Sequence, residues 1–171
     1  MRDGRGDGQR MKKVIVIGCP GSGKSSFSRV LHQQTGIPLC HLDMLYWNAD
    51  RTKVEKDVFR TRLSEALQKD SLILDGNYGS TMELRLQWCD TVFFLDYDLE
   101  TCLSGVISRM GKPREDMPWI ETEEDPKFMT FIKAYISESR PKVLDLLTKY
   151  RDKNVIVFHS RKEAEKYLQM L

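Results

Sequence analysis

A glycine-rich loop is the clearest chemical feature of this sequence. Eight consecutive residues fit the pattern G-x-x-x-x-G-K-[ST] without a gap: Gly18, Cys19, Pro20, Gly21, Ser22, Gly23, Lys24 and Ser25. Glycines let the backbone curl so that its N–H groups point at phosphate oxygens, and a helix beginning near Lys24 adds its positive dipole end. We expect Lys24 to reach the β- and γ-phosphates of ATP, Ser25 to hold Mg²⁺, and Ser26 to complete the nucleotide site.

Aspartates at the ends of apolar runs could supply the second Mg²⁺ ligand. Leu72–Asp75 and Phe93–Asp96 each have the pattern of a strand followed by an aspartate. Asp75 is favoured because the glycine after it would let a substrate approach the backbone, whereas Asp96 precedes a helix and could cap it. Asp43 follows an earlier apolar run and could accept a proton from a substrate hydroxyl; the alternative is a helix cap or turn residue.

Arginines flank a segment that has no helical or strand pattern. Residues 111–126 contain three prolines, with a basic first half and an acidic second half, which predicts a mobile flap. Arg109 and Arg114 lie at its start, and Arg140 lies on the helix expected after it. Charge on a transferred phosphoryl group needs cationic partners, so we expect these arginines to act as clamps. The alternative is that they are ordinary solvated side chains.

The elements that would position these residues alternate along the chain. Short apolar runs typical of buried strands are separated by helical patterns: Val14–Ile17, Ile37–Leu42, Leu72–Leu74, Val92–Leu95 and Val155–Phe158. This alternation predicts parallel βα units. Three helix starts are predicted from capping-box spacing: Thr52 with Glu55, Ser80 with Glu83, and Ser160 with Glu163. Pro141 should break or kink the long helix expected after residue 127.

Length and composition favour one globular domain. The chain has 171 residues, of which 40% are hydrophobic and 30% charged. We expect a disordered polar tail over 1–10 and one domain over 11–171. The four cysteines lack Cys-x-x-Cys spacing, and no apolar run approaches a membrane span, so reduced thiols in a cytoplasmic protein are expected. His41 and His159 have no metal-ligand spacing and are expected to be structural.

With these motifs in place, the chain resembles the adenylate-kinase-like P-loop kinases, and most closely their bacterial subgroup named topology modulation proteins, or FlaR-like. The resemblance runs from about Met11 to Leu171 and rests on the glycine loop, the Asp75–Tyr78 segment, the two arginines around 109–114 and the final strand followed by Ser160. It implies an α/β three-layer P-loop NTPase fold, with helices on both faces of a five-stranded parallel sheet of order 2-3-1-4-5. It also implies an acceptor-binding helical insert over 43–69 and an arginine lid over 111–126.

The resemblance also implies roles for single residues. Asp75 would help to organise Mg²⁺ and the acceptor, Arg109 would cover the adenine, and the loop from His159 to Arg161, which contains Ser160, would border the base. Arg114 and Arg140 match positions where lid arginines grip phosphates.

Two departures from the adenylate kinase pattern bear on the acceptor. The aromatic-proline-arginine sequence after the aspartate-glycine pair is replaced by Asn77-Tyr78-Gly79, and the nearest arginine is Arg85. The monophosphate-binding threonine-glycine and arginine are replaced by residues 41–47. Asp43 resembles the acceptor aspartate of shikimate-type kinases, which would favour an acceptor that carries a hydroxyl.

These observations predict an ATP- and Mg²⁺-dependent phosphotransferase acting on a small-molecule or nucleotide acceptor, as a monomer or homodimer. The alternative is a nucleotide-binding regulator of DNA topology or gene expression. A net charge of +2 without a clustered basic face does not favour DNA binding. A GTPase would need an Asn-Lys-x-Asp sequence, which the chain lacks.

Overall fold

The computed structural model describes residues 11–110 and 126–171, and of residues 126–129 only the backbone. The predicted tail over 1–10 and the predicted lid apart from residue 126 lie outside the described residues, as does Arg114. Within the described part, no helix is both long and apolar enough to cross a membrane.

Five parallel strands form one sheet in the order β2-β3-β1-β4-β5, which confirms the predicted order 2-3-1-4-5. The strands are β1 (Lys13–Gly18), β2 (Leu39–His41), β3 (Leu72–Asp75), β4 (Thr91–Leu95) and β5 (Asn154–Phe158). Because all five strands run in the same direction, their carboxyl ends meet at one edge of the sheet. Any site built from the loops that follow the strands must lie at this edge.

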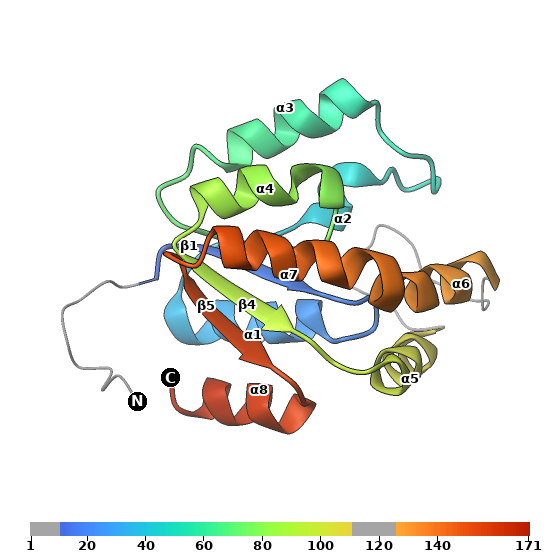
Figure 1. Ribbon diagram of the computed structural model, residues 1–171. Coiled ribbons are helices and arrows are strands. Elements are labelled where there is room, and N and C mark those ends of the chain that lie inside the picture. Colours follow the sequence, from blue (N-terminus) through green and yellow to red (C-terminus); the bar gives the residue numbers. More distant parts are fainter. Residues whose placement is uncertain (1–10, 111–125) are drawn as a thin grey trace.

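Helices cover both faces of the sheet (Figure 1). They are α1 (Lys24–Thr35), α2 (Leu42–Tyr46), α3 (Lys56–Ala66), α4 (Gly79–Trp88), α5 (Leu99–Arg109), α6 (Pro126–Ala134), α7 (Arg140–Lys149) and α8 (Arg161–Gln169). On β1, Val14 and Val16 belong to the core shared with α1, α5 and α8, whereas Ile15 and Ile17 belong to the core shared with α3, α4 and α7. Burial on both faces explains the uninterrupted apolar runs of the central strands.

One of the three predicted capping boxes forms in part, because the carboxylate bonds the residue before the cap. The Ser160 Oγ accepts from the Glu163 N–H at 3.2 Å, and the Glu163 carboxylate accepts from the backbone N–H of His159. The two other predictions are wrong. Glu55, not Thr52, precedes the first residue of α3, and its side chain makes no cap.

In α4, Ser80 lies inside the first turn, and Glu83 accepts hydrogen bonds from Lys149 and Tyr150 instead. A cap at α5 also differs from expectation, because Asp98, and not Asp96, accepts from the Thr101 N–H at 2.8 Å. Glu83 therefore forms an ion pair with Lys149 where a cap was predicted. At α5, Asp98 is the cap where Asp96 was the candidate.

Pro141 interrupts the long helix as predicted. A π-helical turn, η1 (Tyr135–Ser139), separates α6 from α7, and Pro141 lies in the first turn of α7. Proline lacks an N–H and its ring clashes with the carbonyl four residues earlier, so the regular ladder cannot continue through this point.

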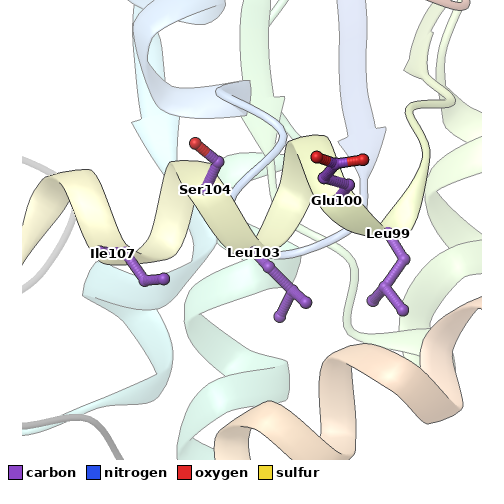
Figure 2. A pocket seen from close by; sticks show the side chains of 5 residues that line it. All are labelled: Leu99, Glu100, Leu103, Ser104 and Ile107. Carbon is purple, nitrogen blue, oxygen red and sulfur yellow. The ribbon is translucent and has the colours of Figure 1, made fainter.

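Helix α5 presents two different faces. Leu99, Leu103 and Ile107 point to the same side, along a surface groove of about 410 Å³ (Figure 2). The opposite face packs directly against the glycine loop. A Cβ added at Gly105 would lie 1.9 Å from the Gly21 carbonyl oxygen, and one added at Gly21 would lie 2.0 Å from that of Cys102. The loop and the helix thus touch backbone to backbone.

This contact predicts that Gly105→Ala destabilises the protein by about 1–3 kcal/mol, because the added methyl group must push the glycine loop away from α5. Gly79→Ala is the matched control. Gly79 is also helical, and a Cβ there would meet nothing within 4 Å. We expect that variant to be neutral, or stabilised by about 0.5–1 kcal/mol. Urea unfolding of both variants measures the difference, and equal midpoints would refute the close packing.

Candidate active site

The glycine loop connects β1 to α1 at the carboxyl edge of the sheet. Gly21 and Gly23 have φ values of 83° and 95°, in the left-handed region that glycine adopts without strain. A backbone hydrogen bond of 3.0 Å from Ser22 N to Cys19 O closes the turn, and α1 begins at Lys24. Pro20 and Ser25 are partly buried, and Ser26 is exposed with its hydroxyl accepting from Arg29.

Lys24 is the residue on which the other charged side chains of the site act. Its Nζ donates to the carbonyl oxygens of Gly18 (3.0 Å) and Cys19 (3.1 Å). Burial lowers the pKa of Lys24, and the charge of Arg109 lowers it further, while Asp43 and Asp75 act in the opposite direction. These four side chains come from different parts of the sequence, and the fold brings the charges of the other three close enough to Lys24 to act on its pKa.

Asp75 ends β3 and is only 4% exposed. It lies beside His41 of β2 in the strand register, and the His41 Nδ1 is 2.6 Å from Asp75 Oδ2. The other carboxylate oxygen, Oδ1, forms no hydrogen bond with the described residues. His41 therefore fixes the orientation of the carboxylate, a contact that ligand spacing in the sequence did not reveal.

The oxygen atoms of Asp75 and Ser25 are of the type that Mg²⁺ prefers. This ion is usually held by one or two carboxylates together with substrate phosphates and water. Within residues 11–110 and 126–171, no three His, Cys, Asp or Glu side chains are grouped to hold a metal by themselves. A hydroxyl on the glycine loop and a single carboxylate at the end of β3, the strand paired with β1, fit the ion's chemistry.

Asp96, the other sequence candidate for Mg²⁺, is engaged elsewhere. Arg140 binds it through two hydrogen bonds, from Nε to Oδ1 at 2.7 Å and from Nη2 to Oδ2 at 2.8 Å. This pairing raises the pKa of Arg140. Both carboxylate oxygens are thus used, which favours Asp75 as the metal ligand. Arg140, expected as a phosphate clamp, anchors the start of α7 to the end of β4.

Asp43 lies in the first turn of α2, but His41 occupies the cap position. The Asp43 carboxylate accepts a hydrogen bond from the Tyr78 hydroxyl. Burial, and then the nearby Asp43 charge, raise the pKa of Tyr78, so this hydroxyl stays protonated and remains a donor. Asp43 thus faces the turn after β3 and does not cap its own helix.

Arg85 does not lie where its position in the sequence suggested. As the nearest arginine after the aspartate-glycine pair, it could have been a ligand for the acceptor, but it is completely buried. Its guanidinium donates to three successive carbonyls, those of Gly76, Asn77 and Tyr78, and to the hydroxyl of Thr81. Arg85 therefore shapes the turn over residues 76–78.

That turn joins the two halves of the site. The Asn77 side chain accepts from the Gly18 N–H at 3.1 Å and donates to the Gly18 carbonyl. The next residue, Tyr78, donates to Asp43. The adjacent side chains of Asn77 and Tyr78 thus bind Gly18, at the start of the glycine loop, and the Asp43 carboxylate, respectively.

Arg161 supports the glycine loop from the C-terminal helix. It donates to the carbonyl oxygens of Ser22 (3.0 Å), Gly21 (2.9 Å) and Thr101 (3.3 Å). Its guanidinium also lies 5.5 Å from the ring centroid of Tyr97. From the sequence, Arg161 was expected only to border the base. Its position after Ser160 was the only signal for that expectation. Ser160 caps α8 beside it.

Comparisons with known proteins found similarity in sequence and in structure. No family model matches the chain. Two adenylate kinase sequences from Thermotoga neapolitana are each 28% identical to it over 88 residues. The match covers 50% of this chain, and the chain spans only 39% of the length of these relatives.

Solved structures cover nearly the whole chain. Shikimate kinase from Bacteroides thetaiotaomicron has a TM-score of 0.61 at 15% identity, covering 94% of this chain and 96% of its own. Shikimate kinase from Acinetobacter baumannii in complex with shikimate has a TM-score of 0.60 at 18% identity, with coverages of 95% and 93%. The chain therefore has the fold of these shikimate kinases, a five-stranded parallel sheet with helices on both faces. By that fold, the chain is similar to shikimate kinases over its described length.

The Arg85 network predicts that Arg85→Lys lowers the unfolding free energy by about 2–4 kcal/mol, because an ammonium group cannot reach all four acceptors and leaves buried carbonyls unpaired. Arg151→Lys, at an exposed turn, is the control and should unfold like the wild type. Chemical denaturation checks both variants. Wild-type stability of Arg85→Lys would mean that the guanidinium does not hold the turn.

Proposed function

We propose that this protein is an ATP- and Mg²⁺-dependent kinase that phosphorylates a small molecule or nucleotide. The observation that carries the proposal is the convergence of Lys24, Arg109, Asp43 and Asp75 at the carboxyl edge of the sheet, around a complete glycine loop. The similarity to adenylate and shikimate kinases supports the reaction class.

Each residue has a chemical task in the proposed reaction. The backbone N–H groups of the loop and the start of α1 bind the phosphates, and Lys24 turns from the loop carbonyls to the β- and γ-phosphates. Mg²⁺ held by Ser25 and Asp75 would neutralise charge on the transferred group. Arg109, at the end of α5, adds a second cation beside Lys24.

Asp43 is better placed than Asp75 to take a proton from the acceptor hydroxyl. Asp75 is almost fully buried and bonded to His41, whereas Asp43 is partly exposed. The Tyr78 hydroxyl holds the Asp43 carboxylate in position. In this division of roles, Asp75 binds the metal and Asp43 takes the proton from the acceptor.

Three finer parts of the proposal rest on the sequence alone. These are the relation to topology modulation proteins, the action on phosphates of Arg114 from a lid and of Arg140, which would have to leave Asp96 to reach them, and a cytoplasmic location. The regulatory alternative predicts salt-sensitive binding to duplex DNA at physiological ionic strength, and a DNA-binding assay on the kinase preparation tests it.

Nucleotide binding should depend on Lys24. At a 100-fold excess over its dissociation constant, ATP with Mg²⁺ should stabilise the wild type by about 2.7 kcal/mol, which is about 5–10 °C in melting temperature. Lys24→Ala should lose most of this shift, because the loop loses its cation for the β- and γ-phosphates. Lys162→Ala, on the exposed side of α8, should keep it. Equal shifts in all three proteins would contradict the proposed phosphate site.

Turnover should depend on Asp43 more than binding does. With the acceptor that best stimulates ATP consumption in a panel of hydroxyl compounds and nucleoside monophosphates, Asp43→Asn should lower kcat by about 10²- to 10⁴-fold. The melting-temperature shift with ATP should stay near that of the wild type. Unchanged kcat in Asp43→Asn would remove Asp43 as the base.

A further inference from the structure

Two cysteines lie beside each other where the glycine loop meets α5. Cys19 is the second residue of the loop, and Cys102 lies in the first half of α5. Their side chains share a hydrogen bond. Both are free thiols in the same buried cluster, with exposed fractions of 1% and 0%. The fold thus pairs two of four cysteines that have no common spacing in the sequence.

The backbones around the two cysteines are also in contact. A Cβ added at Gly21, two residues after Cys19, would lie 2.0 Å from the carbonyl oxygen of Cys102. Two cysteines can form a disulfide only when their backbones are close and their side chains point toward each other. The packing of the loop on α5 brings the backbones together, and the thiol hydrogen bond brings the side chains together. Formation of the bond would draw Cys19 further toward α5.

The two thiols differ in reactivity. The hydrogen bond from Cys19 lowers the pKa of the Cys102 thiol, and the charges of Lys24 and Arg161 lower it further, whereas burial opposes them. The same hydrogen bond, together with burial, raises the pKa of Cys19. Because the thiolate is the form that reacts with oxidants, Cys102 is the cysteine to be oxidised first. Cys19 is then the thiol that completes the disulfide.

We propose that Cys19 and Cys102 form a reversible disulfide that weakens nucleotide binding by the glycine loop. Hydrogen peroxide, a small uncharged oxidant, is the co-reactant. The Cys102 thiolate attacks one peroxide oxygen, which gives a sulfenic acid, and the departing hydroxide takes up a proton to become water. The Cys19 sulfur then attacks the Cys102 sulfur, and its proton leaves with the hydroxyl group as a second water. Two thiols are oxidised, and one peroxide is reduced to two waters.

The disulfide acts on the phosphate site through the backbone of Cys19. Its carbonyl oxygen accepts from Ser22 N at 3.0 Å and from Lys24 Nζ at 3.1 Å. A shift of Cys19 toward α5 therefore moves both the turn of the loop and the side chain of Lys24. A misplacement of about 1 Å in such a site can lower activity by about 100-fold. This consequence rests on the proposed function, because it requires that the loop binds phosphates.

Burial sets the conditions of the reaction and supplies a matched control. Oxidation of the pair needs a small oxidant and a local opening of the loop, because neither sulfur is exposed to solvent. Cys89 is also a free thiol and is 2% exposed, but its Sγ donates to the carbonyl of Leu86 and not to a cysteine. Burial raises the pKa of Cys89 to about 11. Peroxide should therefore oxidise the pair and leave Cys89 reduced.

Alkylation under denaturing conditions, followed by intact-mass spectrometry, tests the disulfide without any nucleotide. A parent protein with Cys40→Ala and Cys89→Ala keeps only the pair. After peroxide treatment, we expect a monomer that has lost two hydrogen atoms and takes up no alkylating reagent until dithiothreitol reduces it. Chymotryptic peptides of the oxidised wild type give the same readout, because the enzyme cuts between Cys89 and Cys102. Alkylation of both thiols, or a gain of two oxygens at one of them, would overturn the inference.

ATP binding by oxidised and reduced samples tests the effect on the loop. Peroxide-treated wild type should bind ATP with Mg²⁺ at least tenfold more weakly than the reduced protein, and dithiothreitol should restore the affinity. Cys102→Ala should bind ATP equally before and after peroxide, whereas Cys89→Ala should lose affinity as the wild type does. Unfolding curves verify that both variants are folded. Equal affinity of the disulfide form and the reduced form would overturn the proposed switch.

The two proposals fail separately in these experiments. If the disulfide forms and the reduced protein does not bind ATP, the kinase proposal fails and the disulfide stands. If the reduced protein binds ATP and no disulfide forms, only the present inference fails.

Discussion

The buried guanidinium of Arg85 fixes the backbone on which the rest of the site depends. A charge without access to solvent is tolerated only when hydrogen bonds replace its water, and Arg85 finds its partners in three successive carbonyls and one hydroxyl. Burial still lowers its pKa to about 10. Those carbonyls can converge only if the chain turns sharply after β3, which explains the positive φ of Gly76 and Tyr78.

The sharp turn determines where two functional groups point. Asn77 reaches the backbone of Gly18 at the entrance of the glycine loop, and Tyr78 reaches Asp43 of the insert. The proposed phosphate side and the proposed acceptor side of the site are thereby connected through adjacent residues. On its other side, the glycine loop is held by Arg161 and by backbone contact with α5 at Gly105. The loop is thus supported from several elements before any ligand binds, a form of preorganisation.

Local sequence patterns predicted the sheet and the glycine loop well. The apolar runs are buried by parallel pairing, and an eight-residue motif with a strand before it and a helix after it leaves few alternatives. The capping box at Ser80 failed because spacing alone does not show which tertiary partner competes, as Lys149 does for Glu83. The capping box at Thr52 failed because the Thr52 hydroxyl donates to the nearby Asp50. Contacts between distant arginines and carbonyls or carboxylates, such as those of Arg85, Arg140 and Arg161, have no local pattern. They follow only from the packed fold.

Transfer of a labelled phosphoryl group tests the central claim most directly. The protein is incubated with Mg²⁺, ATP labelled with ¹⁸O in its γ-phosphoryl group, and a bacterial metabolite extract, and small molecules that gain the label are identified by mass spectrometry. The account predicts at least one labelled phosphorylated metabolite, formed by the wild type and not by Lys24→Ala. Label released only as inorganic phosphate, in equal amounts from both proteins, would contradict it.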